Sequence, residues 1–166
     1  MKKHLRSGNF YLGLAIVMMA ILFYSSSQTY QQQSQIGLLE KLLHSQPFKE
    51  SLSKISFDYA GSEVSIASQG YFSFIEFFIR KLAHFGTYFI LGASFFLGFI
   101  PRSKIYFFTG LLSWLAAAGY AGLDEFHQML TGGRTPLFQD VALDAVGALT
   151  GVFIVALFRF FFRRKK

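Results

Sequence analysis

The stretch "IYFFTGLLSWLAAAGYAGLDEFHQ", residues 105 to 128, begins as a membrane helix and ends in a polar cluster. Its first part, Ile105 to Leu123, contains no formally charged residue. A helix that spans a bilayer needs roughly 20 mainly apolar residues, so this part is long enough. The polar run "DEFHQ", residues 124 to 128, follows directly. We therefore expect a spanning helix whose end contributes to a polar site.

The composition indicates an integral membrane protein. Of the 166 residues, 52% are hydrophobic, 22 are Phe and only 15% are charged. A soluble domain of this size could not bury so much apolar surface. The net charge of +7 could suggest a nucleic-acid partner. The Lys and Arg residues instead flank apolar segments, where they would meet anionic lipid headgroups, so we expect membrane lipids and no nucleic acid as partners.

Four apolar segments predict an all-α membrane protein that forms one domain, residues 1–166. A basic stretch precedes the first segment, which is also compatible with a cleaved signal peptide, but no A-x-A-like cleavage site follows it. The chain contains no cysteine, which excludes disulfides and thiol chemistry. The expected spanning helices are about 9–27, 80–100, 104–124 and 140–159.

The distribution of Lys and Arg predicts the topology. Basic residues precede the first span, lie in the short link between the second and third, and follow the fourth. The positive-inside rule places all three groups in the cytoplasm. We therefore expect a multi-pass protein of the bacterial cell membrane with both termini cytoplasmic and a long extracytoplasmic loop, residues 28–79.

The long loop contains three recognisable patterns. "QTYQQQSQ", residues 28–35, is polar and is expected to be irregular. "IGLLEKLL", residues 36–43, has helical apolar spacing and predicts a short amphipathic helix on the membrane surface. "DYAGSEVSI", residues 58–66, favours a small hairpin. The apolar residues 71–79 either lie in the interface or extend the second helix outward.

This topology brings three helix ends to the same outer face. In the second helix, Lys81, His84 and Tyr88 follow the spacing i, i+3 and i+7, which is one helical face. In the fourth helix, Asp140 and Asp144 are stacked at i and i+4. We therefore predict one shared polar site. Its expected ligand-binding residues are Arg80, Lys81, His84, Tyr88, Asp124, Glu125, His127, Gln128, Arg134, Asp140 and Asp144.

The face of the fourth helix that carries its acids also carries a G-x-x-x-G pattern, Gly147 and Gly151. Such a pattern lets another helix approach closely, so we expect this face to pack inside the bundle or to support a homo-oligomer. An Asp at the centre of a membrane helix costs about 2.5–3.5 kcal/mol on insertion scales. Asp144 therefore needs a partner or a wet cavity. At the expected end of the third helix, Asp124 and Glu125 would oppose the helix dipole and need nearby cations.

The ordered motifs resemble the VanZ-like family of small bacterial membrane proteins. The family takes its name from a member linked to low-level resistance to teicoplanin, so the resemblance implies an envelope role without specifying a reaction. Members often carry Asn where this chain has Asp144, and the additional carboxylate could change the charge or metal preference of the site. The matching motifs are "RKLAHFGTYFILG" at 80–92, "DEFHQ" at 124–128, "GGR" at 132–134 and "DVALDAVGALTG" at 140–151.

Transport by a proton relay through His and Asp is disfavoured because the ionisable groups lie on one side of the membrane, and three other interpretations of the polar site remain open. In the first, Arg80, Lys81 and Arg134 bind a phosphate, pyrophosphate or carboxylate of a lipid-linked wall precursor, an anionic lipid or a lipoglycopeptide. In the second, the protein is a hydrolase, although no H-E-x-x-H or G-x-S-x-G motif is present. In the third, the network only fixes helix packing. For the hydrolase, the catalytic candidates are His84, Asp124, Glu125, His127 and Asp144. No cofactor is predicted. A divalent metal is possible, and its candidate ligands are His84, Asp124, His127 and Asp144.

Overall fold

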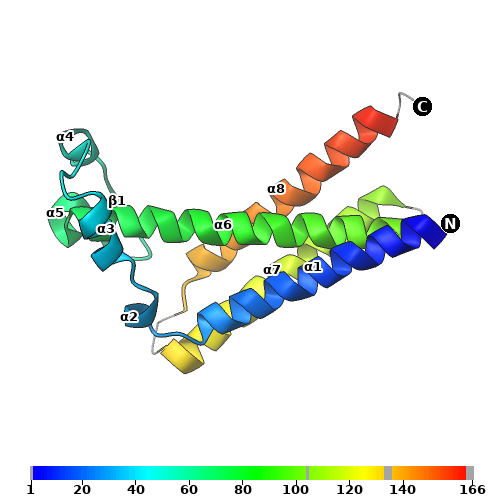
Figure 1. The fold of residues 1–166 in the computed structure, drawn as a ribbon, viewed down its shortest axis with the longest axis horizontal. Helices are drawn as coiled ribbons and strands as arrows, with labels where there is room; N and C mark the ends of the chain where they lie inside the picture. Colours follow the sequence, from blue (N-terminus) through cyan, green and yellow to red (C-terminus); the bar gives the residue numbers. More distant parts are fainter. Residues whose placement is uncertain (1, 104, 133–135, 164–166) are drawn as a thin grey trace.

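The computed structural model describes residues 2–103, 105–132 and 136–163, and it is dominated by four long helices (Figure 1). Each contains a segment long and apolar enough to cross a membrane, which confirms the expected all-α, multi-pass architecture. These helices are α1 (Lys2–Ser26), α6 (Tyr71–Phe99), α7 (Tyr106–Gly132) and α8 (Phe138–Arg163), and the 3-10 turn η1 (Ile100–Arg102) links α6 to α7.

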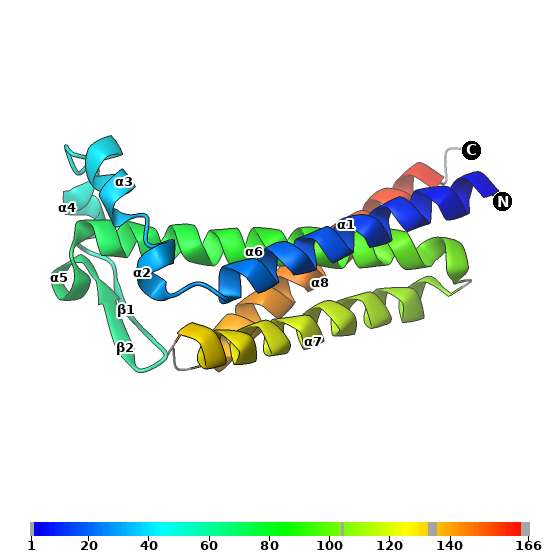
Figure 2. The same ribbon diagram turned by 60° about the horizontal axis from the view of Figure 1, so that its bottom comes forward.

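The two chain ends lie at one end of the bundle and the long loop lies at the other (Figure 1). Figure 2 shows that the hairpin of this loop extends across the bundle end toward the end of α7 and the start of α8. The elements of the loop are α2 (Tyr30–Gln33), α3 (Ile36–Leu42), α4 (Lys49–Leu52), β1 (Ser56–Tyr59), β2 (Ser62–Ser65) and α5 (Ile66–Gln69).

The loop contains more regular structure than the sequence suggests. The α3 helix and the hairpin are confirmed, with Phe57 paired to Val64 and a two-residue turn at Ala60 and Gly61, where φ is 57° and 80°. Positive φ at both positions is typical of the tight turns that match strand twist. The expectation that residues 28–35 are irregular is wrong for Tyr30–Gln33, which form α2, and is confirmed for the residues on either side. Thr29 and Gln32 form a reciprocal capping box that stabilises α2.

All four long helices extend further than the sequence predicts, and the extensions of α6 and α7 affect the site. α6 begins at Tyr71 rather than at residue 80, because the Phe-rich segment before Arg80 is helical and buries Phe74 completely. α7 continues past residue 124 to Gly132, because Asp124 and Glu125 are buried inside the bundle instead of ending the helix at its surface. These two acids are therefore not in the last turn of α7, and the expected conflict with the helix dipole does not arise.

The α6–α8 contact is a close approach of two backbones. A Cβ atom at Gly147 would lie 2.6 Å from the carbonyl oxygen of Phe85, and one at Gly151 would overlap that of Phe89. Both glycines therefore pack α8 against α6 inside the chain, and a contact between two copies through α8 would have to use another face. The same contact sets the position along the α6 axis at which Asp140 and Asp144 of α8 face α6.

Candidate functional site

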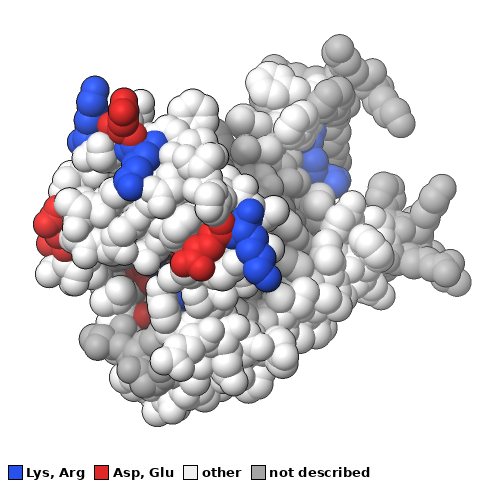
Figure 3. All heavy atoms as spheres, turned by 60° about the vertical axis from the view of Figure 1, so that its left-hand side comes forward, with Lys and Arg blue, Asp and Glu red and all other residues white. Residues whose placement is uncertain are grey.

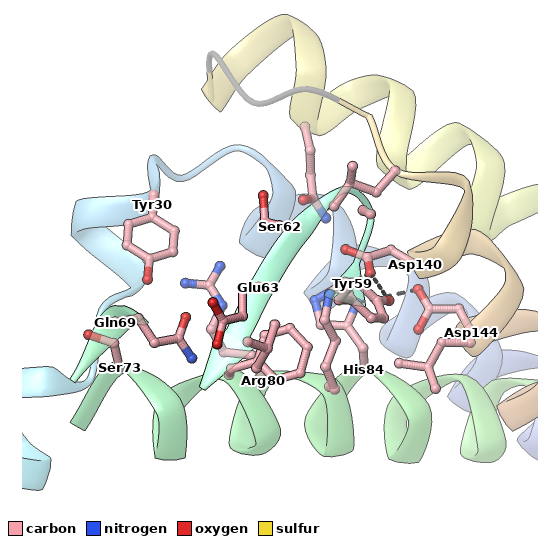
Figure 4. Close-up of a pocket in the computed structure, with 17 residues that line it drawn as sticks. Tyr30, Tyr59, Ser62, Glu63, Gln69, Ser73, Arg80, His84, Asp140 and Asp144 are labelled. Carbon is pink, nitrogen blue, oxygen red and sulfur yellow. Dashed lines mark hydrogen bonds and ion pairs between the residues drawn. The ribbon is translucent and has the colours of Figure 1, made fainter. Parts of the chain in front are cut away.

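A pocket of about 510 Å³ lies at the loop end of the bundle, between the N-terminal half of α6, the start of α8 and the β1–β2 hairpin (Figure 4). Seen from this end, acidic and basic side chains lie beside one another rather than forming a patch of one sign (Figure 3). The lining residues are Tyr30, Tyr59, Ala60, Ser62, Glu63, Val64, Gln69, Ser73, Phe77, Arg80, Lys81, His84, Gln128, Leu137, Asp140, Leu143 and Asp144.

Arg80 is partly held in place. Its Nη2 donates to Oε1 of Gln33 at 2.8 Å, and its guanidinium lies 4.6 Å from the ring centroid of Tyr30. Such a cation–π contact orients the side chain. Its Nη1 is buried and has no hydrogen-bond partner among the described residues. The N–H groups of Arg80 Nη1 therefore have no acceptor within the described part of the chain.

Lys81 and Tyr59 converge on Asp140. Lys81 forms an ion pair with Asp140, and its ammonium lies 4.6 Å from the ring centroid of Tyr59. The Tyr59 hydroxyl donates to Oδ1 of the same carboxylate at 2.5 Å. Burial, followed by this hydrogen bond and the negative charge of Asp140, raises the pKa of the Tyr59 phenol well above its ordinary value. The phenol therefore stays a donor at neutral pH, and the hairpin is tied to both α6 and α8.

His84 and Asp144 form the second pair between α6 and α8. His84 Nδ1 lies 3.4 Å from Oδ2 of Asp144, which is a long hydrogen bond. The His84 side chain is 28% exposed and that of Asp144 only 6%. Oδ1 of Asp144 is buried and has no partner among the described residues. The sequence prediction that Asp144 needs a partner is thus satisfied at one oxygen only.

Tyr88 and Asp124 lie behind the pocket and do not line it. Tyr88 is fully buried and Asp124 is 5% exposed. Asp124 interacts electrostatically with both His84 and Asp144. Neither the Tyr88 hydroxyl nor Oδ1 of Asp124 has a hydrogen-bond partner within the described part of the chain. These two residues form an inner polar layer that a ligand in the pocket would not touch directly.

The remaining residues of "DEFHQ" have separate roles. Gln128 lines the pocket, whereas Glu125 accepts the backbone N–H of Leu137 at 2.7 Å, just before α8 begins. His127 points toward α1, where its Nδ1 lies 2.8 Å from Oγ of Ser26 and its ring stacks on Phe23. His127 therefore links α7 to α1 and does not join His84.

The structure brings six of the predicted residues into one pocket and leaves four outside its lining. Arg134 lies outside the described residues. Within residues 2–103, 105–132 and 136–163, no group of three His, Asp or Glu side chains is arranged to hold a metal ion. The six lining residues are Arg80, Lys81, His84, Gln128, Asp140 and Asp144, and the four others are Tyr88, Asp124, Glu125 and His127.

The long loop contributes pocket residues that the sequence did not identify, chiefly Tyr59, Glu63 and Gln69. A weak signal exists in β1, where Phe57 and Tyr59 alternate with polar residues and so share one face of the strand. Both rings contact Phe77 of α6, at centroid distances of 6.1 and 5.2 Å. These aromatic contacts, together with the hydrogen bond from Tyr59 to Asp140, place the hairpin over the pocket.

The sequence model of the VanZ/LLP1 family matches residues 11–159. The chain belongs to this family. The matched range contains every residue that lines the pocket described above. It confirms the resemblance to the family that the motifs on α6, α7 and α8 carry. A search of curated proteins and a search of solved structures each found no match.

Proposed function

We propose that the pocket lies at the extracytoplasmic face of the membrane and binds the polar headgroup of an envelope lipid or of a lipid-linked cell-wall precursor. The observation that carries this proposal is a pocket of about 510 Å³ that contains Arg80 and Lys81 and opens where the spanning helices end. A lipoglycopeptide with a lipid tail would present similar groups. Binding a wall precursor or such a drug would support a contribution to teicoplanin-type resistance.

The position of the pocket along the spanning helices matches the level in a bilayer at which lipid headgroups lie. At about 1.5 Å per residue, Arg80 lies roughly 29 Å along the axis of α6 from Phe99, the last residue of the helix. The hydrocarbon core of a bilayer is about 30 Å thick. With Phe99 at one boundary of the core, Arg80 and Lys81 reach the opposite boundary, where lipid phosphates lie.

The charge distribution supports the orientation. The end of the bundle opposite the pocket carries both termini and Arg102, which donates to Asn9 of α1 and to the carbonyl oxygen of Gly98. Further Lys and Arg residues lie near both ends of the sequence, and both ends belong to this side of the bundle. By the positive-inside rule this end is cytoplasmic, and the pocket then faces outward.

Hydrolysis of the bound headgroup is a second candidate function, favoured by the His84–Asp144 pair. Asp144 orients the imidazole through Nδ1, and the partly exposed ring is available in the pocket. A His held in this way can act as a general base toward water. Release of a headgroup from a bound lipid, abolished by His84→Gln while lipid binding persists, would support hydrolysis. Unchanged lipid after prolonged incubation would exclude it for that lipid.

Native mass spectrometry of the protein released from membranes in mild detergent tests the binding proposal. The wild type should retain a lipid or precursor, and Arg80→Gln should lose it. Arg102→Gln makes the same substitution at the other end of the bundle and serves as the matched control. A well-folded wild type without bound lipid, or equal retention by Arg80→Gln and wild type, would overturn the proposal.

A further inference from the structure

We infer that the headgroup bound in this pocket is zwitterionic, with an anionic group near Arg80 and a primary ammonium near Asp144. The inference rests on the proposed function, because it specifies the ligand of the same pocket. It follows from the balance of charge in the pocket and from two groups of buried atoms without partners among the described residues: hydrogen-bond donors on one side and an acceptor on the other.

The balance of charge disfavours a multiply charged anion such as a pyrophosphate. Arg80 and Lys81 are the two Lys or Arg residues among the described lining residues, and three carboxylates accompany them: Glu63, Asp140 and Asp144. Lys81 is already paired with Asp140. A ligand of high negative charge would meet more carboxylates than Lys or Arg side chains at short range, and like charges repel strongly where water is scarce. A ligand that carries both signs avoids this repulsion.

One side of the pocket has donors without acceptors. Nη1 of Arg80 and Nε2 of Gln69 are both buried, and neither has a hydrogen-bond partner among the described residues. Both side chains line the pocket, and both lie on the side formed by the start of α6 and by α5 (Figure 4). A phosphate or carboxylate oxygen would accept from both donors, and a guanidinium is well suited to such an oxygen.

The other side of the pocket has an acceptor without a donor. Oδ1 of Asp144 is buried and unpartnered within the described residues, while Oδ2 contacts His84. A primary ammonium has three N–H donors and can meet this oxygen. Rotation of the carboxylate about its last bond turns either oxygen toward the pocket. A quaternary ammonium has no N–H donor and would leave the position unsatisfied.

The residues that carry the two positions lie near one another along α6 and α8. Arg80 and His84 are one turn apart on α6, which is about 6 Å along the axis, and His84 contacts Asp144. A link of two or three carbon atoms between a phosphate and an amine covers a distance of this order, at about 1.5 Å per bond. The spacing of these backbone positions therefore favours a short linker, such as that of a phosphate ester of a short amino alcohol.

Lipid titrations followed by native mass spectrometry test the inference on the full chain in detergent. The probes are phosphatidylethanolamine, phosphatidylglycerol and phosphatidylcholine with identical acyl chains. We expect phosphatidylethanolamine to bind about tenfold more tightly than either of the others, which corresponds to about 1.4 kcal/mol. Competition by soluble O-phosphoethanolamine at the concentration at which the lipid binds would assign the pocket to a soluble zwitterion, and competition only at much higher concentration would assign it to the lipid.

Two variants separate the two charges. Asp144→Asn keeps the shape of the side chain and should abolish the preference for phosphatidylethanolamine over phosphatidylglycerol. Arg80→Gln should weaken the binding of both lipids. Glu50→Gln, on α4 and outside the pocket lining, is the matched acid-to-amide control and should bind like the wild type. Fluorescence of Trp114, the single tryptophan, checks that each variant is folded.

The outcomes distinguish this inference from the proposed function. If phosphatidylglycerol binds the wild type as tightly as phosphatidylethanolamine does, and Arg80→Gln weakens both, the zwitterion inference fails while headgroup binding stands. If phosphatidylethanolamine is preferred equally by the wild type and Asp144→Asn, the assignment of the ammonium to Asp144 fails. If none of the three lipids binds better to the wild type than to Arg80→Gln, headgroup binding at this pocket fails as well.

Discussion

Replacing Gly147 by Ala should separate α8 from α6 and destabilise the bundle. The added Cβ atom would lie 2.6 Å from the carbonyl oxygen of Phe85 and 3.2 Å from its Cα, and both are backbone atoms that cannot turn aside. Overpacking of this kind costs about 1–3 kcal/mol. Ala gains about 1 kcal/mol over Gly in intrinsic helix propensity. The two effects leave a net loss of about 0–2 kcal/mol in the free energy of unfolding, and a loss of about 1–3 kcal/mol relative to a Gly→Ala change that meets no neighbour.

Trp114 makes this loss measurable. It is the single tryptophan of the chain, and its Nε1 donates to the carbonyl oxygen of Ala145 on α8 at 3.0 Å. Its fluorescence should therefore follow the separation of α7 from α8 during unfolding in a denaturing detergent. Gly119→Ala, on α7, is the matched control, because nothing lies within 4 Å of its added Cβ. This control should be neutral or slightly stabilised.

Equal stability of Gly147→Ala and Gly119→Ala would contradict this prediction. It would mean that the close approach of α8 to α6 does not limit packing. A displaced α8 should also weaken the 3.4 Å contact between His84 and Asp144, because the two side chains come from the two helices that separate. Gly147→Ala should therefore bind lipid less well than Gly119→Ala does.

Two further predictions follow from single contacts, and a third follows from the proposed orientation in the membrane. Tyr59→Phe removes the hydroxyl that donates to α8, so the hairpin should lose about 1 kcal/mol of local stability and exchange its amide hydrogens faster. A double-mutant cycle of Ser26→Ala and His127→Ala should give a coupling of about 0.5–1.5 kcal/mol with lipid retention unchanged, and loss of lipid by a folded His127 variant would contradict it. In the cysteine-free chain, a membrane-impermeant thiol reagent should label Ser62→Cys in intact cells and Ser103→Cys only after permeabilisation; the reverse pattern would invert the proposed orientation.

The sequence predicts the site best where helical periodicity determines which residues share a face. Lys81 and His84 follow the spacing i and i+3, and Asp140 and Asp144 follow i and i+4. The structure joins them in two parallel pairs across α6 and α8. The G-x-x-x-G pattern on α8 already indicated that the face carrying the acids is the face that packs.

The sequence predicts the site less well where a contact depends on which helix is the neighbour. His127 has the spacing of a ligand beside Asp124, but the third helix also borders α1, and Ser26 is the nearer partner. The hairpin was expected, yet its position over the pocket depends on Tyr59 reaching Asp140, 81 residues away. Local patterns contain no information about contacts of such long range.

Hydrogen–deuterium exchange with and without bound lipid tests most directly whether the ligand occupies the pocket beneath the hairpin. The delipidated protein would be compared with the same protein loaded with phosphatidylethanolamine. We predict slower exchange in peptides that cover residues 56–65 and the beginning of α8, with no change in α3 and α4. Slower exchange confined to α3 and α4, or no change in residues 56–65 at saturating lipid, would contradict the account.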